Sequence, residues 1–256
     1  MKQIFIAIIV LLSYTSLTAQ QVAGEKADFE HRFLIDMPAA GVLNKGYVSV
    51  MTDLLPYGIM ITRIDVGVFD NFSFGISYGG ENIIGSGEVT WYKQPGVNAK
   101  FKIFNENANL PSITVGFDMQ GKGRYFERDN RYEIKSPGFY AAVSKNYEFL
   151  GYLSLHGVVN YSLEGDDGQN FTNFMIGVEK TLGPQVSLVV DYNFGFNDNN
   201  TNRYGKGNGY LNAGLRWTVG SGFTIGFDLR DLLNNKLWSP GTADRAIRFD
   251  FTQRIL

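Results

Sequence analysis

The sequence predicts an all-β fold, a single transmembrane antiparallel up-and-down β-barrel of about twelve strands. Three observations predict it. Apolar and polar residues alternate strictly in segments of about nine to twelve residues, the length that a tilted membrane strand needs. The links between these segments alternate between short and long, and the composition is rich in Gly (30), Phe (20) and Tyr (14). A soluble sandwich also has alternating strands, but it gives no reason for link lengths to alternate in phase with them.

The first twenty residues have the features of a secretory signal peptide. Lys2 forms a basic start, residues 4–12 form an apolar run too short for a standard spanning helix, and small residues follow up to Ala19. We expect cleavage after residue 19 or 20 and export to the bacterial outer membrane. Residues 21–44, which contain DFEHRFLIDMPAAG, are predicted to form a periplasmic arm or an insert in the barrel lumen.

Residues 45–256 are predicted to form the barrel. Its clearest strand is SITVGFDMQ, in which Ile113, Val115 and Phe117 share one face while Thr114 and Asp118 lie on the other. The predicted strands are residues 46–53, 57–69, 72–79, 96–105, 112–120, 137–145, 153–162, 171–180, 185–197, 211–219, 223–230 and 247–252.

The links separate into two sets. The short links are residues 69–71, 105–110, 145–149, 181–185 and 219–222, and the long polar links are residues 80–95, 121–136, 163–170, 198–208 and 234–245. Outer-membrane barrels have short periplasmic turns and longer external loops. With an even number of strands, both termini are expected in the periplasm.

The polar face of the strands carries many charges, which would be costly in a dry core. In a barrel these charges line the lumen, and the apolar face contacts lipid. We expect barrel closure to gather Arg63, Asp65, Arg216, Asp228, Arg230, Arg248 and Asp250. This cluster is either a charged constriction that selects solutes or a salt-bridged plug that fills a narrow lumen. Twelve strands give an intermediate bore, and we favour the plug.

The sequence offers little catalytic or metal-binding chemistry. His156 could serve a hydrolase, but alternation places it in the middle of a strand, facing the lumen, and a hydrogen-bonded structural role is the better interpretation. The acidic loop EGDDGQN lacks the spacing of an EF-hand loop. We therefore predict no catalytic residue, no metal and no cofactor. Net charge is −2 and no basic block is present, which argues against a nucleic-acid partner.

Aromatic residues are frequent at strand ends and in loops, where membrane proteins place interfacial girdles. Trp91 and Trp238 lie in two of the long links and are also candidate contacts for sugars.

Four segments resemble the YjbH-like outer-membrane proteins, and together they cover most of residues 34–163. They are LIDMPAAGVLNKGYV, SYGGENIIGSGEVTW, LPSITVGFDMQGKGRY and SPGFYAAVSKNYEFLGYLSLHGVVNYSL. The family pattern is a small-residue start, an apolar strand running into a glycine-rich loop, and a strand ending in Ser-Lys. This resemblance implies an association with exopolysaccharide production or export, although typical members are much longer than this chain.

The sequence thus predicts a non-enzymatic outer-membrane protein, accessory to exopolysaccharide production or export. Its expected partners are membrane lipid and either polysaccharide or the export machinery. The alternatives are a small porin-like solute channel, an outer-membrane hydrolase that depends on His156, and an adhesive barrel.

Overall fold

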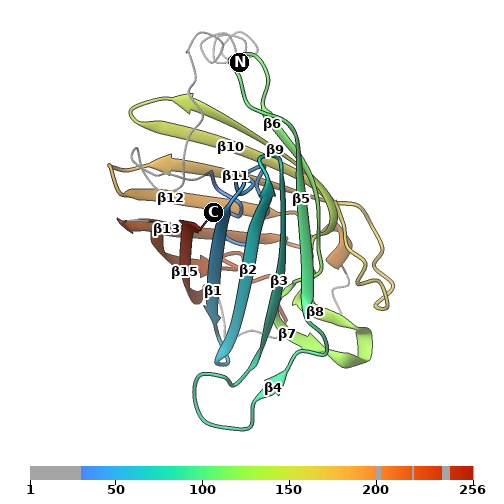
Figure 1. The fold of residues 1–256 in the computed structure, drawn as a ribbon. Helices are drawn as coiled ribbons and strands as arrows, with labels where there is room; N and C mark the ends of the chain where they lie inside the picture. Colours follow the sequence, from blue (N-terminus) through green and yellow to red (C-terminus); the bar gives the residue numbers. More distant parts are fainter. Residues whose placement is uncertain (1–29, 200–202, 221, 238–242, 256) are drawn as a thin grey trace.

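The computed structural model describes residues 30–199, 203–220, 222–237 and 243–255. Within them, twelve long strands form one closed antiparallel barrel (Figure 1). These strands are β1 (Tyr47–Leu55), β2 (Ile59–Phe69), β3 (Phe72–Glu81), β5 (Gly96–Phe104), β6 (Ser112–Asp118), β9 (Gly138–Glu148), β10 (Tyr152–Tyr161), β11 (Asn173–Thr181), β12 (Val186–Asn193), β13 (Tyr210–Gly220), β14 (Phe223–Arg230) and β15 (Asp244–Arg254). The signal-peptide prediction lies outside the described residues.

Each long strand pairs with its neighbour in sequence, and β15 pairs with β1, so that Tyr47 lies opposite Arg254. This pairing closes the ring and places the start of β1 and the end of β15 at the same end of the barrel. The barrel is strongly twisted: in Figure 1, β1, β2, β3 and β5 run steeply while β10 to β13 lie nearly across the view. The predicted fold class is confirmed.

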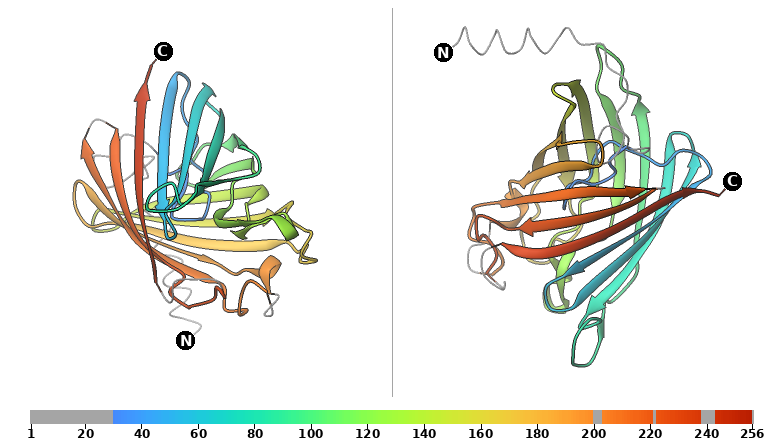
Figure 2. Two further views of the ribbon diagram at one scale, coloured as in Figure 1. Left: turned by 90° about the horizontal axis from the view of Figure 1, so that it is seen from below. Right: turned by 90° about the vertical axis from the view of Figure 1, so that its left-hand side faces the viewer.

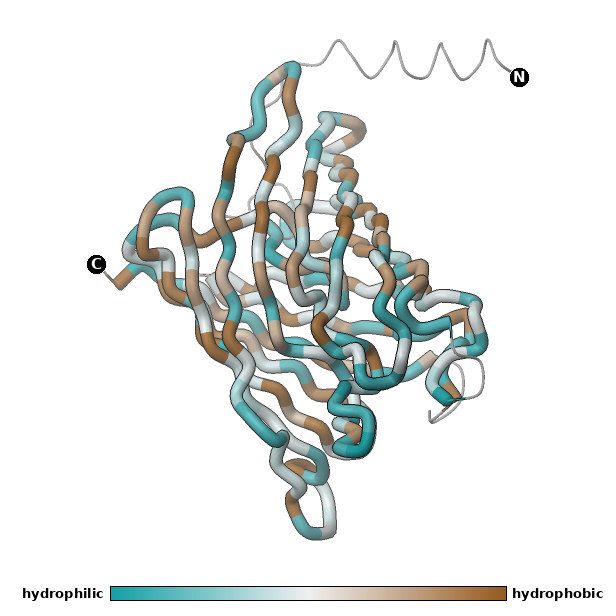
Figure 3. Tube along the Cα trace, turned by 90° about the vertical axis from the view of Figure 1, so that its right-hand side faces the viewer, coloured by the Kyte–Doolittle hydropathy of each residue, from teal (hydrophilic) through white to brown (hydrophobic). Residues whose placement is uncertain are grey.

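The alternation predicted from the sequence sets which side chains face the lumen. In β6, Ser112, Thr114 and Asp118 are buried, whereas Val115 is 38% exposed on the outer surface. Figure 3 shows the same change between hydrophilic and hydrophobic residues along many strands. The apolar face of SITVGFDMQ therefore points outward, where a membrane-spanning barrel meets lipid.

The links lie at opposite ends of the barrel according to length. Short turns join β2 to β3, β5 to β6, β9 to β10, β11 to β12 and β13 to β14, and longer links occur at the other end. We call these the turn end and the loop end. The link from β1 to β2, residues 56–58, is a short exception at the loop end.

One long link has structure that the sequence did not predict. Residues 121–136 were expected to be a loop, but they contain the hairpin of β7 (Lys122–Phe126) and β8 (Arg131–Ile134) with a 3₁₀ turn at Glu127–Asp129. Two smaller elements also lie at the loop end, the short strand β4 (Thr90–Trp91) and a 3₁₀ turn at Phe196–Asp198.

A search of the described residues for helices found none with the length and apolar character needed to cross a membrane.

Candidate functional site: the filled lumen

Residues 30–44, which we call the lumen segment, lie inside the ring of strands (Figure 2). An isolated bridge between Phe33 and Pro38 folds the segment into a tight turn. Its apolar side packs on one side of the barrel wall. That cluster consists of Leu34, Ile35, Met37 and Ala40 of the segment with Tyr140, Ala142, Val158, Met175 and Val189 of the wall. A Cβ atom on the inward-facing Gly177 would lie 2.2 Å from Cδ1 of Leu34, so only glycine leaves room for this contact.

Charged side chains of the wall also hold the backbone of the lumen segment. The Asp191 carboxylate accepts hydrogen bonds from the backbone N–H groups of Ile35 and Asp36, both at 2.9 Å, and of Met37 at 3.2 Å. Arg248 donates to the carbonyl oxygens of Leu34 and Ile35, both at 2.7 Å. These contacts satisfy polar backbone groups that would otherwise be buried without partners.

Further contacts of the same kind come from two other wall cations. Arg216 donates to the carbonyl of Leu34 at 2.8 Å, and Lys100 donates to the carbonyl of Arg32 at 2.5 Å. The wall therefore binds a peptide backbone by its polar groups from several sides.

The side chains of the lumen segment form ion pairs with the wall. Arg32 contacts Asp65 at 2.9 Å and Asp250 at 2.7 Å, and Asp36 contacts Arg230 at 2.7 Å. At the turn end, His31 lies 2.7 Å from Glu179, and Glu30 pairs with Lys102. Because removing one partner of a buried pair leaves the other uncompensated, these contacts make the segment's position specific.

The predicted lumen charges all face the lumen, and all but the partly exposed Asp250 are buried, but they do not form a single cluster. Asp65, Arg230 and Asp250 bind side chains of the lumen segment. Arg63 pairs with Asp118 of β6 at 2.8 Å and also interacts electrostatically with Asp65, its neighbour on the same face of β2.

The other predicted charges pair with wall residues. Arg216 contacts Asp228 at 2.5 Å, and Arg248 contacts Asp53 at 2.6 Å while also reaching the lumen segment. The sequence analysis identified neither Asp53 as a partner nor Asp191 as a backbone acceptor. Both side chains are buried in the lumen, and alternation carries no information on what a lumen-facing side chain binds.

The β7–β8 hairpin covers the loop end of the lumen. It emerges between β6 and β9, which lie opposite β14 and β15 in the ring of strands. Yet Tyr132 of this hairpin belongs to a buried cluster with Leu55, Ile59 and Ala246 from β1, β2 and β15. Lys122 of the hairpin also pairs with Asp53 of β1. The hairpin thus spans the opening and contacts the far wall.

The loops beside this hairpin are joined by a buried charge cluster. Arg131 is fully buried, contacts Asp167 at 2.6 Å and Asp198 at 2.8 Å, and lies 3.9 Å from the ring centroid of Tyr204. Burial opposes the charged form of Arg131, but the Asp198 carboxylate and the hydrogen bonds that Arg131 donates to both acids raise the pKa of the guanidinium above its usual value. Burial lowers the pKa of Lys135, which donates to Asp167 at 2.8 Å. These contacts hold the loops over the barrel. We call the interacting residues Arg131, Lys135, Asp167 and Asp198 the loop cluster.

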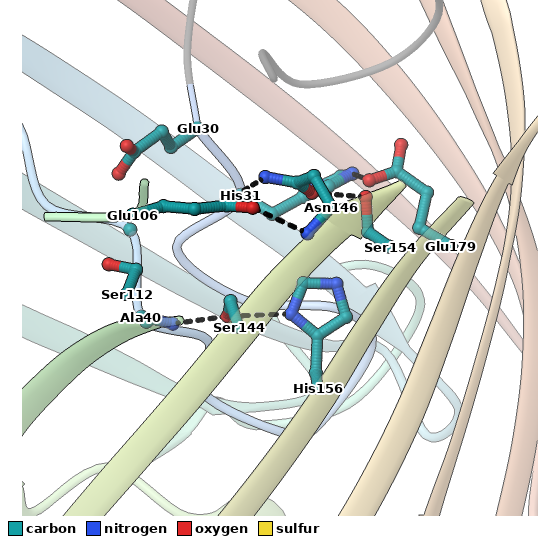
Figure 4. Close-up of a pocket in the computed structure, with 11 residues that line it drawn as sticks. Glu30, His31, Ala40, Glu106, Ser112, Ser144, Asn146, Ser154, His156 and Glu179 are labelled. Carbon is teal, nitrogen blue, oxygen red and sulfur yellow. Dashed lines mark hydrogen bonds and ion pairs between the residues drawn. The ribbon is translucent and has the colours of Figure 1, made fainter. Parts of the chain in front are cut away.

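His156 lies in a small polar cavity toward the turn end (Figure 4). Its Nδ1 atom is 2.8 Å from the Ser144 hydroxyl, which accepts a hydrogen bond from the Ala40 backbone N–H at 3.1 Å. The cavity has room for about 20 Å³, the scale of one water molecule. A hydrolase substrate would not fit here. Among the described residues, no three His, Asp or Glu side chains form a candidate metal site.

The structure describes only one of the two predicted sugar contacts, Trp91. Trp91 is 57% exposed and stacks on Tyr78, with ring centroids 5.6 Å apart. Since Tyr78 faces outward from β3, this pair fits an interfacial girdle. Trp238 lies outside the described residues.

Comparisons with known proteins support the fold. No protein-family model and no curated protein matches the chain, so the resemblance to YjbH-like proteins stays a prediction. Among solved structures, the chain is similar to the KdgM porin, with 10% identity and a TM-score of 0.51, covering 82% of this chain and 99% of that one. A structure of the KdgM porin in complex with disordered oligogalacturonate gives 10% identity, a TM-score of 0.50 and the same coverage. The NanC porin gives 10% identity and a TM-score of 0.45, covering 82% of this chain and all of that one. At these identities the likeness concerns the fold alone.

Proposed function

We propose that this chain is a non-enzymatic, porin-like protein of the bacterial outer membrane. Its diffusion path is closed by the lumen segment and the β7–β8 hairpin. The path conducts small solutes when both move away.

The observation that carries this proposal is that several lumen-facing charges of the wall bind the lumen segment. If the lumen were simply filled by wall side chains, the wall charges would pair with one another. Instead Asp65, Asp191 and Arg230 bind the lumen segment, which enters the barrel from the turn end. Without that segment they would line a wet, charged passage of the kind that selects solutes. Similarity to the KdgM porin over 99% of its chain adds support for this class of barrel.

The role in exopolysaccharide production or export stays a prediction of the sequence resemblance, and no structural observation favours it over a channel. A hydrolase role is disfavoured by the water-sized cavity beside His156.

The test is single-channel recording in planar bilayers at high salt. In the first variant, Gly177→Leu, the new side chain occupies the place of Leu34 and displaces the lumen segment. In the second, a glycine-serine linker replaces residues 122–134 and removes the hairpin. Because the two closures act in series, we expect small or rare currents from the wild-type protein and from each single variant. The combined variant should give large, stable steps.

A matched control places leucine at Gly157, another strand glycine, whose added Cβ would meet only a Val143 methyl at 3.3 Å. All variants must first show heat-modifiable gel mobility, which reports a folded barrel. Silence from the folded combined variant would contradict the channel proposal. Function would then have to lie in the loops or in a partner.

A further inference from the structure

An open groove crosses the lipid-facing surface of β5, β6, β9 and β10. It has a volume of about 530 Å³. Small side chains, Ala99 and Ala141, lie in it beside Val115, and larger aromatic side chains border it. The aromatic side chains are Phe72, Phe101, Phe117, Phe139 and Tyr161. Phe101 and Phe139 are 44% and 59% exposed, so the groove opens toward the membrane.

A polar pocket of about 340 Å³ lies at the loop end of the same strands. Its mouth carries two opposite charges joined by an amide. Lys93 donates to Oδ1 of Asn130 at 2.9 Å, and Nδ2 of Asn130 donates to Asp166 at 2.7 Å. Tyr125 lines the same pocket, and Glu164 lies in its wall.

The groove and the pocket meet at Phe117, which lines both. Its ring lies 4.7 Å from that of Phe139, its partner on the neighbouring strand. Gly138 of the pocket directly precedes Phe139 of the groove. The two cavities together are therefore apolar in the membrane band and polar at its loop-side boundary.

We propose that these two cavities form one binding site for a membrane phospholipid with a zwitterionic headgroup. The acyl chain lies in the groove against Ala141. The phosphate contacts Lys93 and the ammonium group contacts Asp166. The headgroup takes the place of the Asn130 side chain, which bridges Lys93 and Asp166 in the structure.

The chemistry of the pocket favours this ligand over others. Surface ion pairs are weak alone, but a zwitterion meets both charges at once while its chain is buried in the groove. An anionic lipid would meet Asp166 unfavourably, and a free sugar would leave the apolar groove unused. An acyl chain that enters the groove leaves other lipid chains, so its gain comes from packing contacts in the groove, and the headgroup should set selectivity.

The test is native mass spectrometry of the full chain, refolded and incubated with phosphatidylethanolamine or phosphatidylglycerol. We expect the wild-type protein to retain one phosphatidylethanolamine molecule in preference to phosphatidylglycerol. Ala141→Phe fills the groove and should abolish retention. Its control is Ala213→Phe, an equivalent change at a half-buried, outward-facing alanine of β13, away from the groove.

Lys93→Ala should weaken phosphatidylethanolamine binding by about two- to fivefold, the range expected for one exposed ion pair. Lys206→Ala is the control, because Lys206 is also an exposed loop lysine that donates to a single oxygen, the carbonyl of Asn234. Asp166→Asn should remove the preference for phosphatidylethanolamine. Three outcomes would each overturn the proposal. They are equal retention of phosphatidylethanolamine by Ala141→Phe and Ala213→Phe, no lipid preference in the wild-type protein, and preferential retention of lipopolysaccharide.

Discussion

At the scale of single residues, Asp167 shows how burial and pairing compete at the loop end. Burial alone would raise the pKa of this carboxyl group. Hydrogen bonds from Lys135, the Gln169 backbone and Arg131, together with the charge of Lys135, instead hold its pKa below the ordinary value of 3.8. A carboxylate with a lowered pKa stabilises the folded state at neutral pH, and that contribution is lost as the pH falls below 3.8. Glu164 has the opposite sign: burial raises its pKa above 4.5, so its contribution to the stability of the folded state is lost as the pH rises above 4.5 and the buried group ionises.

We therefore expect Asp167→Asn to loosen the loop cluster at pH 7. Loss of the carboxylate leaves Arg131 and Lys135 short of a buried partner, which costs about 3–5 kcal/mol for a buried pair. Hydrogen–deuterium exchange of residues 127–136 should be faster in the variant at pH 7. As the pH falls through the lowered pKa of Asp167, the wild-type protein should approach the variant. Equal exchange rates of the two proteins at pH 7 would show that the carboxylate charge is not responsible.

At the scale of elements, the sequence predicts some features well and misses others for a physical reason. The extents of the strands follow from alternation, because one face of each strand meets lipid and the other meets the lumen. Residues 30–44 and 121–136 carry no such pattern, since the former lie inside the lumen and the latter lie at the loop end. Their positions depend on contacts between distant residues, such as the lumen segment with Asp191 and Tyr132 with β1 and β2. The same limit explains why Asp118 was not identified as the ion-pair partner of Arg63: alternation assigns a face but not a neighbour.

The lumen segment gives a prediction at this scale. In Asp191→Asn, the three backbone N–H groups of residues 35–37 lose a charged acceptor, and hydrogen bonds to charged groups contribute about 1.5–3 kcal/mol. The population with the segment released should rise about tenfold or more. Trypsin cannot enter the lumen, so it should cleave after Arg32 only when the segment is released. The new N-terminus at Phe33 reports this cleavage. Asp118→Asn is the control, because Asp118 pairs with Arg63 of the wall. Equal cleavage rates in the two variants would contradict the anchoring role of Asp191.

At the scale of the whole molecule, the barrel is inside out relative to a soluble protein: its charges are buried and its apolar side chains are exposed. The burial pattern alone cannot distinguish lipid from another apolar partner, but a charge placed on the outer surface can. Ile64, 43% exposed near the middle of β2, should lie close to the bilayer midplane. Arginine at a barrel midplane costs about 2–4 kcal/mol, and near the interfaces it costs about 0–1 kcal/mol.

Ile64→Arg should therefore lower the free energy of unfolding in lipid vesicles by about 2–4 kcal/mol, measured by guanidinium titration. Val68→Arg, an outward position on the same strand close to the turn end, should lower it by no more than about 1 kcal/mol. Depth in the membrane is the main variable that separates these two apolar positions, which have similar exposed fractions of 43% and 41%. Equal costs at both positions would mean that the outer surface of β2 does not span a bilayer, and the assignment of the apolar face to lipid would fail with it.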